Sequence, residues 1–184
     1  DESKAKIDAA RKAFDAVLKA DEANVTNKQT LLDAEAKYAA LEADHKAAKD
    51  VDDLIDAIGE VTYPTSKTAI DAAKNAYGKL TEAQQALVTK KATLDAVEAA
   101  YEALEADHLA AEAVDGLIGL IPDPVVYTTE CDKAIKDARA AYNALTEAQQ
   151  ELVEDLDVLE VAEAAYEALK ADHEAAEAVN ALIG

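Results

Sequence analysis

The sequence predicts an all-α fold, an elongated spectrin-like rod of tandem three-helix bundles that share long continuous helices. Three observations predict it. The 184-residue chain contains an internal sequence repeat in three copies, which favours several small modules over one large domain. Each copy contains a run of roughly 25 residues with helical apolar spacing and without glycine or proline. Aromatic residues make up only 4 % of an alanine-rich chain, which is typical of close-packed helices with thin cores.

The repeat is clearest in an eight-residue stretch, Tyr-x-Ala-Leu-x-Ala-Asp-His. It occurs at 38–45, 101–108 and 166–173, so the period is nearly constant and the second interval is slightly longer than the first. Apolar residues continue at spacings of three and four through this stretch, so His45 is expected on the apolar face. We therefore expect an uninterrupted helix across 41–48 and across the equivalent ranges 104–111 and 169–176.

Each copy begins with a helix that we call helix A, expected at 3–20, 66–80 and 130–145. A short segment follows, which reads Thr-Glu-Ala-Gln-Gln from Thr81 and from Thr146. Threonine followed three residues later by glutamine is a capping box, so a two-turn helix is predicted there. The first copy has Leu18 in place of the threonine, and its short helix is expected to be weaker or differently shaped.

The long helix then begins at Thr30, Thr93 or Asp157. Asp33 follows Thr30 and Glu160 follows Asp157 at capping-box spacing. In the first copy Gly59 is the expected C-cap. In the second, Gly116 and Gly119 weaken the helix end, and Pro122 and Pro124 terminate it.

The turns at 60–65 and 123–128 are short, so each helix A must run back along the second half of the preceding long helix. This predicts four parts: an incomplete N-terminal repeat at 1–45, three-helix bundles at 46–108 and 109–173, and the start of a further module at 174–184. The open N-terminal pair of helices and Val179, Leu182 and Ile183 suggest head-to-tail contacts between molecules, a heterologous interaction that builds open fibres.

Charge and hydropathy limit the partners. With 18 basic and 39 acidic residues the formal net charge is −21, which repels nucleic acids and anionic membranes. No 18-residue apolar run or signal peptide occurs, so no membrane insertion is expected. The chain lacks methionine and begins at Asp1, so we expect it to be an excised or processed part of a longer protein.

The stretch Val61–Val88, which contains the second helix A and the Thr-Glu-Ala-Gln-Gln segment, resembles a known repeat. It is similar to the tandem three-helix "found in various architectures" (FIVAR-like) modules of Gram-positive cell-surface and secreted proteins. The resemblance covers essentially the whole chain. It implies a structural stalk or spacer, outside the cell or in the cell wall, that presents another domain. The alternative is an adhesin-type module that binds a host or partner protein. A cytoskeletal spectrin-type protein is disfavoured because the chain has no tryptophan.

The histidines and the single cysteine are the residues with potential for chemistry. His45, His108 and His173 occupy one equivalent position, and metal ligands must converge within about 2 Å of the ion, which single histidines a module apart cannot do. We therefore predict a packing or boundary role at the junction between bundles. Cys131, near the start of a helix, is expected to be a non-functional thiol. No Ser-His-Asp, Cys-His, phosphate-loop or CxxC pattern exists, so no enzyme, catalytic residue, cofactor or metal site is predicted.

Aromatic and outer charged residues are the candidates for binding surfaces. Phe14, Tyr77 and Tyr142 on helix A, and Tyr38, Tyr101 and Tyr166 on the long helix, either form a sugar-stacking platform or fill the core; their apolar spacing favours the core. Tyr63 and Tyr127 lie in turns and are the better candidates for exposed contacts. A stalk should carry scattered charges on its outer surface, and the positions expected there are Lys37, Glu42, Glu98, Glu105 and Glu163.

Overall fold

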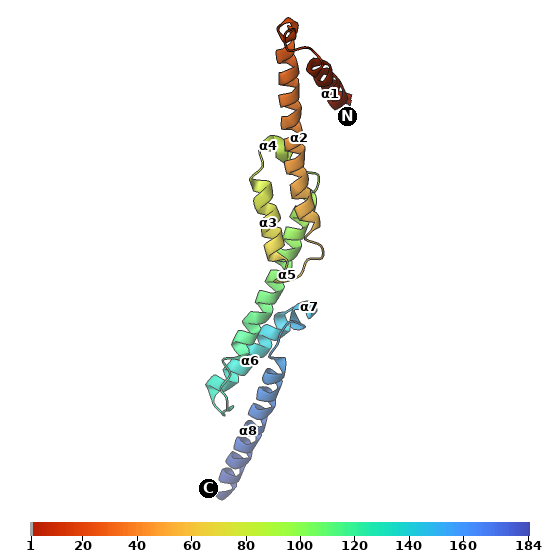
Figure 1. Cartoon of the computed structure of the whole chain (residues 1–184). Helices are drawn as coiled ribbons and strands as arrows, with labels where there is room; N and C mark the ends of the chain where they lie inside the picture. Colours follow the sequence, from red (N-terminus) through yellow and green to blue (C-terminus); the bar gives the residue numbers. More distant parts are fainter. Residues whose placement is uncertain (1) are drawn as a thin grey trace. The chain divides into compact units, whose positions relative to one another are not determined.

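A computed structural model describes residues 2–184, so Asp1 lies outside the described part of the chain. Helices are its only regular elements, and no strand occurs between residues 2 and 184. The all-α fold class is thus confirmed. In chain order the elements are α1 (Glu2–Asp15), the 3₁₀ helix η1 (Glu22–Asn24), α2 (Lys28–Asp56), α3 (Lys67–Gly78), α4 (Glu82–Gln85), α5 (Lys91–Ile118), α6 (Thr129–Ala144), α7 (Glu147–Gln150) and α8 (Leu156–Ile183) (Figure 1).

The three long helices are continuous, as predicted. Ranges 41–48, 104–111 and 169–176 lie wholly inside α2, α5 and α8, which have 29, 28 and 28 residues. Alanine is by far their commonest residue, and leucine and glutamate are frequent; all three have high intrinsic helix propensity. Ion pairs one turn apart add support, for example Lys46 with Asp50 at 2.6 Å and Lys49 with Asp53 at 2.6 Å.

The starts of the long helices differ from the prediction. They begin at Lys28, Lys91 and Leu156 rather than at Thr30, Thr93 and Asp157. The expected capping boxes of the first and third long helices are absent, because the N-cap residues are Asn27 and Asp155, and neither side chain makes a capping hydrogen bond. For α5 and α8 the cap comes from the preceding long helix, as shown below.

The helix ends also differ from the prediction. The first helix A stops at Asp15 instead of residue 20. Helix α2 ends at Asp56, and Gly59 lies three residues further on, with φ of +64°. That left-handed conformation is one that glycine adopts without steric cost. Gly116 lies inside α5, which continues to Ile118.

The form of each short helix depends on the local sequence of its copy. Helices α4 and α7 begin after Thr81 and Thr146 with complete capping boxes, as predicted, but each is four residues long rather than two turns. The first copy forms only the three-residue η1, without a side-chain cap. Its departure from the Thr-Glu-Ala-Gln-Gln wording therefore has the expected structural effect.

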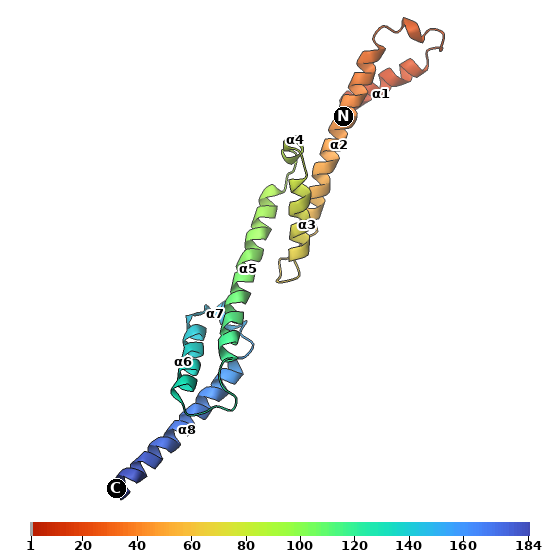
Figure 2. The same ribbon diagram turned by 90° about the vertical axis from the view of Figure 1, so that its left-hand side faces the viewer.

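The chain divides into two compact units, residues 1–99 and 100–184, and the division falls within α5. In the first unit, α1 packs on the front half of α2, while α3 and α4 pack on its rear half (Figures 1 and 2). This brings segments up to 40 residues apart into contact, as in the bond from Gln84 to Asp44.

The second unit has a core built by three helices. Its buried residues come from the rear half of α5, from α6 and from the front half of α8: Val114, Ile118, Cys131, Ile135, Ala138, Leu159, Ala162 and Tyr166. Leu117, Ile121, Tyr142 and Val153 pack around them. Helix α6 thus shares one core with the rear half of α5 and the front half of α8.

Candidate functional site

The histidine position does not pack as predicted. His45 and His173 are exposed and His108 is half-buried, whereas Asp44, one residue earlier, is half-buried. Successive residues on a helix point about 100° apart, so an error of one position moves the buried face by that angle. The expectation that His45 lies on the packed face is wrong, and the aspartate beside it takes that place.

Among residues 2–184 there is no group of three or more histidine, cysteine, aspartate or glutamate side chains that could hold a metal ion. Within the same range, none of the helices combines the length and apolar character needed to cross a membrane.

The contacts that recur in both units define the candidate site, which is a surface for binding helices. We call it the docking face: five positions on the rear half of each long helix. In α2 they are Asp44, Ala48, Val51, Asp52 and Ile55, and in α5 Asp107, Ala111, Val114, Asp115 and Ile118. The three apolar members are 2 % exposed in both helices, because the following helices pack over them.

The first aspartate of the docking face holds the short helix. The Nε2 of Gln84 donates to Asp44 Oδ1 at 2.8 Å, while its Oε1 accepts from the backbone N–H of Thr81 at 3.0 Å. One glutamine therefore both completes the capping box and fixes α4 to α2. The neighbouring Gln85 donates to the carbonyls of Tyr77 and Leu80, at 3.2 and 3.3 Å, and so satisfies acceptors at the end of α3.

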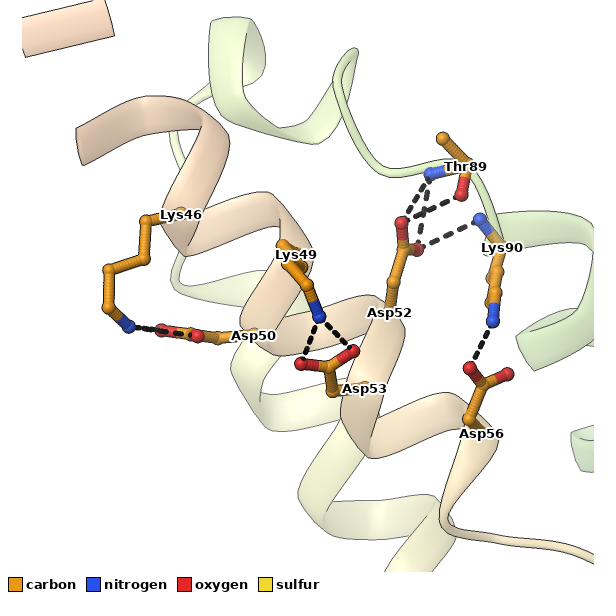
Figure 3. A network of polar contacts seen from close by, with 8 residues as sticks. All are labelled: Lys46, Lys49, Asp50, Asp52, Asp53, Asp56, Thr89 and Lys90. Atoms are coloured by element: carbon orange, nitrogen blue, oxygen red, sulfur yellow. Dashed lines mark hydrogen bonds and ion pairs between the residues drawn. The ribbon is translucent and has the colours of Figure 1, made fainter. Parts of the chain in front are cut away.

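The second aspartate caps the next long helix. Asp52 accepts the backbone N–H groups of Thr89 at 3.1 Å and Lys90 at 3.0 Å, and the Thr89 hydroxyl at 2.7 Å (Figure 3). These N–H groups directly precede α5 and would otherwise lack intrahelical partners. The Lys90 side chain also forms an ion pair with Asp56, which lies on α2 like Asp52. A residue of α2 thus supplies the N-cap of α5.

Electrostatics agree with this role of Asp52. Burial raises the pKa of its carboxyl, hydrogen bonds from Thr89 and Lys90 lower it, and the balance lies below the ordinary value. The charged form is therefore favoured in the folded chain.

The second unit repeats both contacts. Gln149 Nε2 donates to Asp107 Oδ1 at 2.8 Å. Asp115 accepts the N–H groups of Glu154 at 3.1 Å and Asp155 at 3.0 Å, ahead of α8. The same chemistry at the same repeat positions shows that it is a property of the repeat.

Ion pairs join helix A to the long helix in each copy. Arg11 binds Glu35, Lys74 binds Glu98, and Arg139 binds Glu163, always at the same separation along the chain. Hydrogen bonding from Arg11 lowers the pKa of Glu35. Of the positions predicted on the outer surface, Lys37 and Glu42 are exposed, but Glu98, Glu105 and Glu163 are half-buried.

The aromatic residues divide by position. Tyr101 and Tyr166 are buried, as the core prediction required, and the Tyr166 hydroxyl donates to the Thr128 carbonyl at 3.3 Å. The other aromatics of the helices are half-buried, namely Phe14, Tyr38, Tyr77 and Tyr142. Tyr127 is exposed, as expected, with its ring centroid 4.8 Å from that of His173 and 5.5 Å from that of Tyr166. Tyr63, in contrast, is half-buried.

Cys131 is fully buried in the core of the second unit. Alignment of the three copies of the repeat places Ser3 and Ser66 at its position. Its backbone N–H donates to Thr128 Oγ1 at 3.2 Å, which caps α6. The thiol packs as a small apolar side chain.

In the first copy, the surface of helix A and the long helix that corresponds to the covered surface of the other copies is not packed against any helix between residues 2 and 184. Between α1 and the front half of α2 lies a groove of about 490 Å³, lined mainly by apolar side chains that include Ile7, Ala10, Phe14, Leu31 and Ala34. In the other two copies the corresponding helix A and long helix pack against a docking face.

Comparisons with protein-family models, with characterised proteins and with solved structures found no match to this chain. The repeat contacts themselves are therefore the basis for inferring its function.

Proposed function

We propose that the chain is a non-catalytic stalk, a rod of FIVAR-like three-helix modules that holds another domain away from a bacterial surface. The observation that carries this proposal is the N-cap that Asp52 and Asp115 give to the following long helix. Each cap lies within one module, where it holds the start of a long helix, and α5 then continues without a break from the first unit into the second. Such a connection resists bending better than a flexible linker does.

Surface composition supports the same proposal. The net charge of −21 disfavours collapse onto a like-charged surface and keeps the chain soluble. In this proposal the chain is extracellular and belongs to a secreted or wall-attached protein, and the gene sequence on either side of it tests that placement.

Small-angle X-ray scattering tests the rod. Helices of this length are each about 42 Å long, so an extended array should have a radius of gyration above about 25 Å. A compact chain of 184 residues would give about 16 Å. A value near the compact one would overturn the proposal.

A helix-breaking variant makes the test sharper. Leu41 is an exposed residue in the middle of α2, so Leu41→Pro should disrupt this helix without removing a core side chain. We expect a broader distance distribution from scattering, while Leu41→Ala leaves it unchanged. Equal profiles for both variants would show that the continuity of α2 does not set the shape.

A protein-binding module is the second candidate. Val179, Leu182 and Ile183 are exposed on the rear half of α8, and exposed apolar clusters mark interaction surfaces.

A further inference from the structure

We propose that the rear half of α8 in one copy of the chain binds in the groove between α1 and α2 of a second copy. Repeated head to tail, this heterologous contact builds open chains of molecules. The inference is independent of the stalk proposal, because it concerns association between copies rather than the stiffness of one copy.

The rear half of α8 carries a third docking face. The repeat period places Val179 at the position of Val114, and Ile183 at that of Ile118. The two residues in α5 are each 2 % exposed, whereas Val179 is 53 % and Ile183 is 79 % exposed. The same residue types thus occupy the same positions, but no helix between residues 2 and 184 packs over Val179 and Ile183.

The groove carries the complementary half. Ala73 and Ala138 face a docking face and are 0 % exposed, but their equivalent Ala10 is exposed. Leu94 and Leu159 are buried, while their equivalent Leu31 is half-buried and lines the groove of about 490 Å³. In the second and third copies, a docking face covers the positions equivalent to Ala10 and Leu31.

The capping contact also has its counterparts. Asn180 stands at the position of Asp52 and Asp115, and an amide oxygen accepts N–H groups as a carboxylate does. Helix α2 begins after Asn27 without a side-chain cap. Asn180 of a second copy would supply it.

One polar pair opposes the contact. Asp172 is equivalent to Asp44, but Asp21 replaces the glutamine that binds it in the other copies. Two carboxylates then face each other where Gln84 and Asp44 are hydrogen-bonded. This repulsion makes the contact between copies weaker than the contacts between a docking face and the helices that cover it inside the chain. Asp21→Gln removes the repulsion, so it should strengthen association.

Sedimentation velocity across a concentration series tests these directions. At high salt, which screens the net charge of −21, the average mass should rise above that of the 19.4 kDa monomer. Asp21→Gln should lower the dissociation constant and Ile183→Glu should raise it by at least about tenfold. Val161→Glu is the matched control, because Val161 is 69 % exposed on the front half of α8, and it should leave association unchanged.

A mixing experiment identifies the two surfaces. Ala10→Glu blocks the groove and Ile183→Glu blocks the tail, so each variant alone should stay monomeric. Mixed, the intact tail of the first and the intact groove of the second should form a dimer that grows no further. Circular dichroism first checks that each variant keeps its helices, since both positions are exposed.

Three results would overturn the proposal. The unaltered chain could stay monomeric at millimolar concentration and high salt; association could survive both glutamate substitutions, which would assign it to another surface; or the mixture could fail to dimerise.

Discussion

At the scale of residues, an aspartate on one helix supplies the start of another. Asp52 accepts two backbone N–H groups that lie 37 and 38 residues later in the chain, and Asp115 does the same 39 and 40 residues later. Each contact satisfies donors that a helix cannot satisfy itself. The start of each following long helix therefore depends on the helix before it.

Substitution of Asp52 separates its charge from its hydrogen bonds. Asp52→Ala should lower the free energy of unfolding by about 1–2 kcal/mol at neutral pH, as for other lost N-caps. Asp52→Asn keeps an acceptor, so it should cost less. Urea denaturation monitored by circular dichroism measures both, and equal losses would contradict a role for the retained oxygen.

The same carboxyl predicts a pH dependence. Its pKa in the folded chain lies below the ordinary value of 3.8, so the charge contributes stability above that pH. The contribution is lost as the pH falls through the folded pKa. The difference in stability between the unaltered chain and Asp52→Asn should therefore be full near neutral pH and should fall as the pH drops through the folded pKa. A difference that does not change as the solution is acidified would rule out this charge effect.

The buried tyrosines give a prediction for the core. Tyr101 is buried, so Tyr101→Ala should destabilise the chain by about 3–5 kcal/mol, as do other large-to-small aromatic substitutions. Tyr38→Ala, at the half-buried equivalent position, should cost clearly less. Chemical denaturation compares them, and a loss below about 1 kcal/mol for Tyr101→Ala would contradict a core position.

At the scale of elements, local patterns were the predictable part. The boxes at Thr81 and Thr146 join residues three apart, and the sequence alone located them. The Asp52 cap joins residues far apart in sequence, and no local rule reveals it. Recurrence of aspartate at 44 and 107, and at 52 and 115, was the available signal.

The error at His45 has a physical cause. Between Tyr38 and Val51 alanine occupies several sides of the helix, at 39, 40, 43, 47 and 48. Apolar periodicity locates a buried face by contrast with polar residues, and alanine spread over several sides of a helix gives little contrast. The continuity of the helix was predictable there, but the direction of its buried face was not.

Two glycines give an element-scale test. Gly59 has φ of +64°, so Gly59→Ala should destabilise the chain by about 1–2 kcal/mol even though an added Cβ would meet no atom within 4 Å. Gly116 lies within α5 and also has open space for a Cβ, so Gly116→Ala should stabilise by up to about 1 kcal/mol. Thermal denaturation measures both changes in stability. If both substitutions stabilise or both destabilise the chain, the left-handed conformation of Gly59 or the helical conformation of Gly116 is wrong.

At the scale of the whole molecule, the two units are built by one rule. Each has a docking face covered by the helices that follow it. In such arrays stability is approximately a sum of module terms and nearest-neighbour terms. Damage to one docking face should therefore act mainly on the helices that cover it.

Hydrogen exchange tests this locality. Val114→Ala removes a side chain from the core of the second unit and should cost about 2 kcal/mol there. Amide protection should fall in α6 and in the front half of α8, but not in α3. Val179→Ala, at the equivalent exposed position, should change protection little. Equal loss of protection in α3 and α6 would show that the chain unfolds as one cooperative unit.

The docking face also bears on how such a chain changes its length over evolution. The sequence repeats with a nearly constant period, but each packed seam joins the end of one repeat to the beginning of the next. A single repeat contains a docking face at its end and, at its beginning, helices that cover the docking face of another repeat, and these two surfaces do not pack against each other within that repeat. Duplicated in tandem, it adds one complete seam from surfaces that already fit. Gene duplication and recombination can therefore lengthen or shorten the array by whole repeats without any new interface having to evolve.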